Sequence, residues 1–136
     1  MQTIVLTIGG IFWILTYVFI ISKGFKDKTY GMPLIALCAN ISWELIFSFI
    51  LPHSPLQLFV NYLWFGLDSV IVFQFFKYHK NEFPNMSSLK VYTSFSLLIF
   101  SAFSIILLDT IMLGDHRGVY SAFGQNLLMS ILFLVM

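Results

Sequence analysis

Three acidic residues lie within long apolar segments of this 136-residue chain: Glu44, Asp68 and Asp109. Placing a carboxylate in lipid costs on the order of 3 kcal/mol, so such residues usually face other helices or a watered cavity and have a function. A carboxyl group kept away from water tends to hold its proton, because burial disfavours the charged form. It can then act as a general acid toward an alkene or an epoxide.

Amide and aromatic side chains accompany these acids. Asn40 precedes Glu44 by one helical turn, so the two share a face. Asn61, Trp64 and Asp68 share another face by their spacing. Aromatic rings can stabilise a carbocation that water would otherwise quench. We expect Glu44 and Asp68 to be catalytic and the following residues to bind substrate: Asn40, Trp43, Asn61, Tyr62, Trp64, Asp109, Gln125 and Asn126.

Helical rise predicts the depth of these groups in the membrane. Glu44, Asn61, Gln125 and Asp109 are expected about 6–10 Å below the outer ends of their helices. They would form one polar layer in the outer half of the bilayer. Asp68 is expected about 18 Å deep, near the midplane.

The same polar groups are open to other interpretations. Intramembrane acids and amides also join helices through hydrogen bonds, worth about 0.6 kcal/mol each. A polar stripe can also carry a solute or protons. A cyclising enzyme needs a closed aromatic cavity, whereas a transporter or channel needs a polar route to both faces. Spacing alone leaves catalysis, transport and a structural role open.

Composition identifies the elements that must position these groups. Hydrophobic residues make up 59% of the chain and charged residues 10%, which is far from the balance of a water-soluble domain. A net charge of +1 excludes a strongly basic nucleic-acid-binding protein. Three histidines without ligand spacing indicate no metal site. We expect a single all-α domain over residues 1–136, an integral multi-pass bundle with five spans at about 3–22, 30–51, 56–76, 91–113 and 119–136.

The charges between the spans predict their orientation. All six lysines fall in the first and third connections, and Arg117 lies alone in the fourth. Lysine and arginine accumulate on the cytoplasmic side, so the N-terminus is expected outside. The last span ends on LFLVM without a polar flank, which suggests a fragment or a truncated member of a larger family.

One segment carries a family resemblance. Residues 26–50, KDKTYGMPLIALCANISWELIFSFI, closely resemble the second-helix signature of the integral-membrane terpene cyclases of fungal meroterpenoid and indole-diterpene pathways, which have bacterial relatives. Residues 121–136 and 64–78 are similar to later parts of the same family. The matching residues of the first segment are Tyr30, Gly31, Met32, Pro33, Ala36, Leu37, Asn40, Trp43 and Glu44.

The resemblance implies an activity and its partners. It implies acid-initiated cyclisation of a prenyl chain or its epoxide on a small-molecule acceptor, within a lipid bilayer and with no metal or redox cofactor. Glu44 matches the glutamate that protonates the substrate. The family has seven helices and a second key aspartate on the last, whereas five are expected here. Either two helices are missing or a catalytic partner is lacking, and Asp68 or Asp109 could substitute. A small transporter or a non-catalytic scaffold is the alternative.

Overall fold

The structure, a computed structural model, describes the backbone of residues 2–135 and the side chains of residues 8–135. This part of the chain contains only helices, so the prediction of an all-α bundle is confirmed. The elements are α1 (Gln2–Asp27), α2 (Leu34–Leu45), a π-helical turn η1 (Ile46–Ile50), α3 (Pro55–Glu82), α4 (Ser88–Leu113) and α5 (Val119–Val135).

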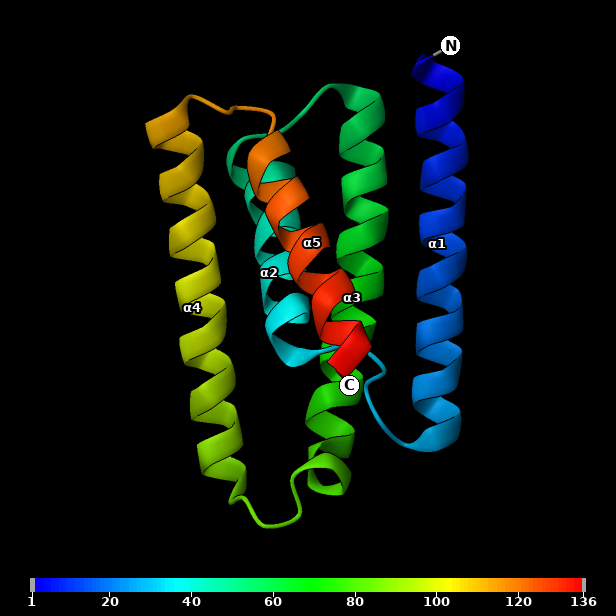
Figure 1. Cartoon of the computed structure of the whole chain (residues 1–136), viewed down its shortest axis with the longest axis vertical. Coiled ribbons are helices and arrows are strands. Elements are labelled where there is room, and N and C mark those ends of the chain that lie inside the picture. The colour runs from blue at the N-terminus through cyan, green and yellow to red at the C-terminus, as the bar shows by residue number, and fades with distance from the viewer. Residues whose placement is uncertain (1, 136) are drawn as a thin grey trace.

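The helices alternate in direction along the bundle (Figure 1). The start of α1 and the connections at 51–54 and 114–118 lie at one end, called here the outer end. The lysine-rich connections lie at the other. Long apolar segments of α1, α3 and α4 could each cross a membrane, whereas Leu34–Ile50 and Val119–Val135 are shorter apolar helices. Both lysine-rich connections thus lie at the same end of the bundle, which agrees with the alternation of charge along the sequence.

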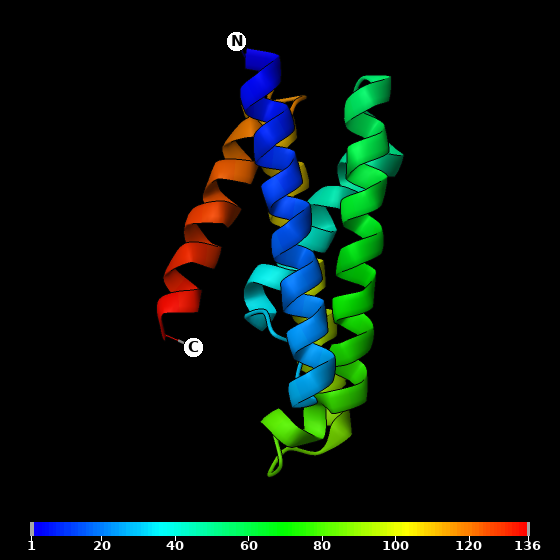
Figure 2. The ribbon, with the colours of Figure 1, turned by 90° about the vertical axis from the view of Figure 1, so that its right-hand side faces the viewer.

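Helix α2 is the central element. It packs against α3, α4 and α5, and nine of its twelve residues are buried. The view in Figure 2 shows α2 crossing behind α1 between α3 and α5. Side chains on nearly every face of α2 are therefore fixed by neighbours, including the polar pair Asn40 and Glu44.

Several predicted boundaries were wrong. Helix α1 continues to Asp27 and α3 to Glu82, because lysine stems can lie along apolar surface while their charged ends reach water. Helix α2 begins only at Leu34, since a residue before proline avoids the helical conformation and Pro33 has an extended ψ of 131°. Its far end changes to π-helical geometry at Ile46.

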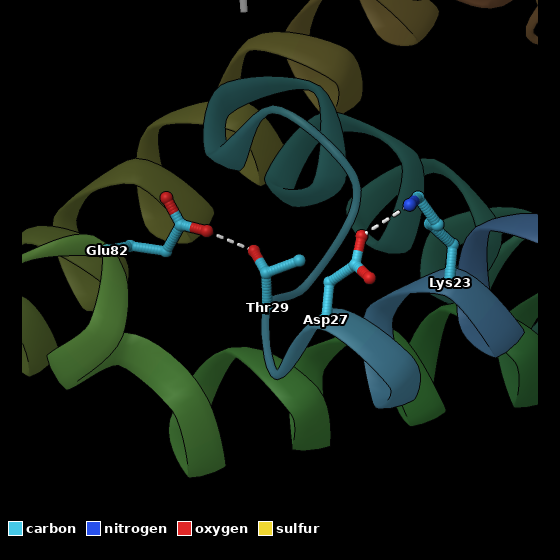
Figure 3. Close-up of polar contacts among 4 residues, drawn as sticks. All are labelled: Lys23, Asp27, Thr29 and Glu82. Atoms are coloured by element: carbon cyan, nitrogen blue, oxygen red, sulfur yellow. Dashed lines mark hydrogen bonds and ion pairs between the residues drawn. The ribbon is translucent and has the colours of Figure 1, made fainter.

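The connection from α1 to α2 is tied to the end of α3 (Figure 3). Lys28 adopts a left-handed φ of 56°, and the Thr29 amide donates to the Gly24 carbonyl at 2.9 Å, which closes α1. The Thr29 hydroxyl donates to the Glu82 carboxylate, and Asn81 Nδ2 donates to the Lys28 carbonyl at 2.8 Å. The lysine-rich end is thereby closed by polar contacts.

Apolar side chains fill the half of the bundle above that connection. The buried cluster includes Tyr30, Leu37, Ile71, Phe75 and Phe95. The rings of Tyr30 and Phe75 meet edge to face at 5.1 Å, and those of Phe75 and Phe95 stack at 5.3 Å. This half of the bundle is a packed core.

The outer end is held by a contact between a loop and α2. Trp43 Nε1 donates to the Gly118 carbonyl at 3.0 Å. Gly118 has a φ of 62°, and a Cβ atom there would collide with the Phe47 ring and lie 2.7 Å from Trp43 Nε1. Only glycine therefore fits between the loop and these two rings.

Replacement of Gly118 by alanine should destabilise the protein more than the same change at Gly114. Gly114 also has a left-handed φ, of 64°, but open space around it. Gly114→Ala is expected to cost about 1–2 kcal/mol for the backbone alone. Gly118→Ala adds a steric penalty of about 1–3 kcal/mol. Thermal unfolding in detergent measures both, and equal melting temperatures would contradict the tight contact.

Candidate active site

Two carboxyl groups meet between the helices. Glu44 of α2 is 3% exposed and Asp68 of α3 is fully buried. Their side chains, together with the Tyr17 hydroxyl of α1, are close enough to interact. Asn40 Nδ2 donates to the Tyr17 hydroxyl oxygen at 2.9 Å, which leaves the Tyr17 hydrogen free for a carboxyl oxygen. Three helices thus converge on one acidic pair.

The pair has few compensating contacts. Glu44 Oε2 and both Asp68 oxygens are buried without a hydrogen-bond partner among the described residues. Burying two unpaired carboxylates side by side is costly. Two neighbouring carboxyl groups can avoid that cost by sharing a proton, as carboxyl pairs in enzymes do. The geometry is therefore suited to holding a proton that can be given to a substrate.

The position of Asp68 differs from the predicted one. It was expected deeper than Glu44, but the structure brings the two together. The reason is the connection at residues 51–54, which extends toward the outer end beyond η1, so that α3 begins further out than α2 and η1 end (Figure 1). Two hydrogen bonds nearer the outer end show the same displacement of α3 relative to α2 and η1. Asn61 Nδ2 donates to the Phe47 carbonyl at 3.2 Å, and the Tyr62 hydroxyl donates to the Ser48 carbonyl at 3.3 Å.

A cavity of about 810 Å³ lies in the outer half of the bundle, between α1, α2, α3 and α5. Glu44 lines it directly, whereas Asp68 is not among the lining residues and is reached through Glu44. The walls are mainly apolar and aromatic, with Trp13 from α1, Trp43 from α2 and Trp64 from α3. The cavity thus presents one acid to an apolar ligand and surrounds that ligand with indole rings.

The structure brings most of the predicted site residues together. Asn40, Trp43, Trp64, Gln125 and Asn126 line the cavity beside Glu44, and their binding role stays a prediction.

Three other predicted residues are not among those that line it. Asn61 is buried beneath η1. Tyr62 is 44% exposed and packs on Phe49. Asp109 is half-buried near the end of α4.

Tyr17 and Trp13 were not among the residues predicted for the site. Both lie on α1, four residues apart, with their rings edge to face at 6.3 Å. An aromatic pair at this spacing on an apolar helix was a possible signal, because residues four apart share a face. The other missed residue is His53, in the outer connection.

His53 closes the outer end of the site. Its ring stacks on Phe47 at 4.8 Å, and its Nδ1 accepts from Asn61 Nδ2 at 3.0 Å. It lines a second cavity of about 610 Å³, which adjoins the first because Trp43 and Asn126 line both. Burial lowers the pKa of His53, and this effect outweighs the backbone hydrogen bond to Arg117 and the charge of Asp115, which act to raise it. The imidazole is therefore neutral when it accepts this hydrogen bond.

No group of three or more histidine, cysteine, aspartate or glutamate side chains placed to hold a metal ion was found among the described residues.

The protein should lose stability as the pH falls, and His53 should be the cause. A lowered pKa means that the unfolded chain binds the proton more tightly, so protonation favours unfolding. We expect the melting temperature to drop between about pH 7 and about pH 5. His53→Gln should flatten this dependence, whereas His116→Gln, at an exposed histidine of the neighbouring loop, should leave it unchanged. An unaltered pH dependence in His53→Gln would contradict the assignment.

Comparison with known proteins identifies the family. The family model of Pyr4-like transmembrane terpene cyclases matches residues 1–136. The Pyr4-family terpene cyclase mfmH of Annulohypoxylon moriforme is 36% identical over 77 residues, which are 57% of this chain and 32% of that protein. Asnovolin H synthase nvfL of Aspergillus novofumigatus is 42% identical over 79 residues, which are 56% of this chain and 32% of that protein. The terpene cyclase pyr4 of Aspergillus fumigatus is 33% identical over 77 residues, which are 56% of this chain and 32% of that protein.

The matched segments cover about a third of the length of each of these relatives. No solved structure matches the chain. The family model covers the whole chain, and its membrane character agrees with the three long apolar helices. This chain therefore belongs to the Pyr4-like transmembrane terpene cyclases.

Proposed function

We propose that this protein is a membrane-embedded terpene cyclase that protonates a prenyl chain, or its terminal epoxide, on a small-molecule acceptor. The observation that carries the proposal is the position of Glu44. Glu44 lines an aromatic cavity, has a buried oxygen without a hydrogen-bond partner among the described residues, and lies close to Asp68. The printed names of the relatives, terpene cyclase and asnovolin H synthase, support the reaction class.

The proposed reaction is an isomerisation. The Glu44 proton moves to the alkene carbon or to the epoxide oxygen, and in the second case the C–O bond breaks. The resulting carbocation is attacked by the neighbouring double bond of the same chain, and a proton is finally lost to a base. Indole rings of Trp43 and Trp64 stabilise the positive charge along the way. Atoms balance within the substrate, because one proton enters and one leaves.

Asp68 has a positioning role in this proposal. It lies close enough to Glu44 to interact with it and is not among the residues that line the cavity, so it acts on the substrate only through Glu44. Tyr17 and Asn40 hold the pair from the other side by their mutual hydrogen bond. Removing either carboxyl group changes where the shared proton resides.

The membrane orientation is part of the same proposal. The five helices would cross the bilayer as a multi-pass bundle, with the lysine-rich connections in the cytoplasm and the cavity in the opposite half. The lysine-rich half is filled by the buried cluster of Tyr30, Leu37, Ile71, Phe75 and Phe95. A cavity that ends on such a core supports a cyclase, whereas a transporter requires a polar route through that half.

Glu44→Gln should abolish product formation. Membranes carrying each protein would be incubated with prenylated acceptors and their epoxides, and mass spectrometry would detect products of unchanged mass. Glutamine keeps the size of the side chain but cannot donate a carboxyl proton, so a loss of more than about 100-fold is expected. Glu82→Gln is the matched control, because Glu82 lies at the lysine-rich end, on Thr29.

Each outcome of this experiment has a distinct meaning. An isomer from wild type and Glu82→Gln but absent from Glu44→Gln supports the proposed acid. Equal rates in all three proteins would remove Glu44 from the mechanism. Absence of product from wild type across the panel would contradict the cyclase proposal itself.

A further inference from the structure

The cavity contains polar atoms that the protein itself leaves unpaired. Asn40 Oδ1, Glu44 Oε2, Trp64 Nε1 and Gln125 Oε1 are buried, have no hydrogen-bond partner among the described residues, and belong to side chains that line this one cavity. A buried polar group without a hydrogen-bond partner destabilises the fold, because it has lost its hydrogen bonds to water. Native proteins seldom retain such groups without a ligand or a function, so a polar atom of the ligand is expected here.

The chemistry of the four atoms restricts that ligand. An indole N–H can only donate, and an amide oxygen can only accept. The indole N–H of Trp43, which lines the cavity from α2, already donates to the Gly118 carbonyl. Trp64 is thus an indole donor without a partner among the described residues, on a side chain that lines the cavity, and it requires an acceptor atom.

Trp64 is also placed next to the acid. It precedes Asp68 by four residues on α3, so the two side chains lie on one face, a single turn apart. Asp68 in turn lies close enough to Glu44 to interact with it. The Trp64 side chain and the Glu44 carboxyl group therefore lie near one another on the wall of the same cavity.

We infer that Trp64 is a positioning residue whose indole N–H binds the oxygen of a terminal epoxide while Glu44 protonates it. The inference rests on the proposed cyclase function and adds that Trp64 selects an oxygen-bearing prenyl end over a plain alkene. When the proton arrives and the C–O bond breaks, the oxygen becomes a hydroxyl group. That hydroxyl can donate to Asn40 Oδ1 or Gln125 Oε1, which have no donor before the reaction.

The test replaces Trp64 by phenylalanine, which keeps an aromatic ring and removes the donor. Cyclisation of an epoxide and of the corresponding alkene is measured for wild type and for Trp64→Phe. The epoxide kcat/KM should fall about 10- to 100-fold, because the epoxide oxygen is no longer held in position for the Glu44 proton and misplacement of a reacting group can cost about 100-fold. The alkene value should change far less. Trp13→Phe makes the same substitution in the same cavity, and it should affect both substrates alike.

A binding measurement decides the inference without turnover. Two saturated, unreactive prenyl analogues are compared, one ending in a methyl ether and one in a hydrocarbon, by thermal shift of the protein in detergent. Wild type should bind the ether about fivefold more tightly, the value expected for one hydrogen bond. Trp64→Phe should lose this preference, and Trp13→Phe should keep it.

The outcomes separate the two proposals. Equal losses on epoxide and alkene in Trp64→Phe, or an ether preference that survives the substitution, would overturn the role of Trp64 and leave only a packing role. Wild-type protein that yields no isomer from either substrate would contradict the cyclase proposal, while the ether preference would still report on Trp64.

Discussion

The close approach of the buried carboxyl groups of Glu44 and Asp68 is the constraint on which the rest of this structure depends. Two carboxyl groups are placed together away from water, where each unpaired charge would destabilise the fold. The helices around them supply Tyr17, which accepts a hydrogen bond from Asn40, and among the described residues no cationic side chain lines the cavity beside Glu44. A proton shared by the pair removes the electrostatic conflict. The same proton is the reagent that an acid-initiated cyclisation requires.

The architecture can be understood as support for that pair. Helix α2 carries Glu44 and is enclosed by neighbours on almost all sides, so the acid has little freedom to move. The packed core at the lysine-rich end gives the cavity a floor. At the outer end, the turn at Gly118 and the stacked rings of Phe47 and His53 fix the other boundary. The π-helical turn η1 lies at this boundary, where such irregular turns often mark functional sites.

Local features of the site could be predicted from the sequence, and features set by helix placement could not. The five helices and the shared face of Asn40 and Glu44 follow from apolar length and helical spacing. The meeting of Glu44 with Asp68 depends on how far the connection at 51–54 carries α3 outward, which no local pattern reports. Tyr62 and Asp109 fall outside the cavity because the rotation of a helix about its axis is fixed by its neighbours. The role of Tyr17 beside the two acids could not be predicted, because α1 is largely apolar along its length and its sequence does not show which residues face α2 and α3.

The kinetics of Asp68→Asn would test the central claim most directly. The account predicts that kcat falls by about 10-fold or more, because Asp68 acts on the proton held by Glu44. KM should remain close to the wild-type value, since Asp68 is not among the residues that line the cavity. An unchanged kcat, or a raised KM with kcat intact, would contradict the account, because it would show that the two carboxyl groups do not work as one acid.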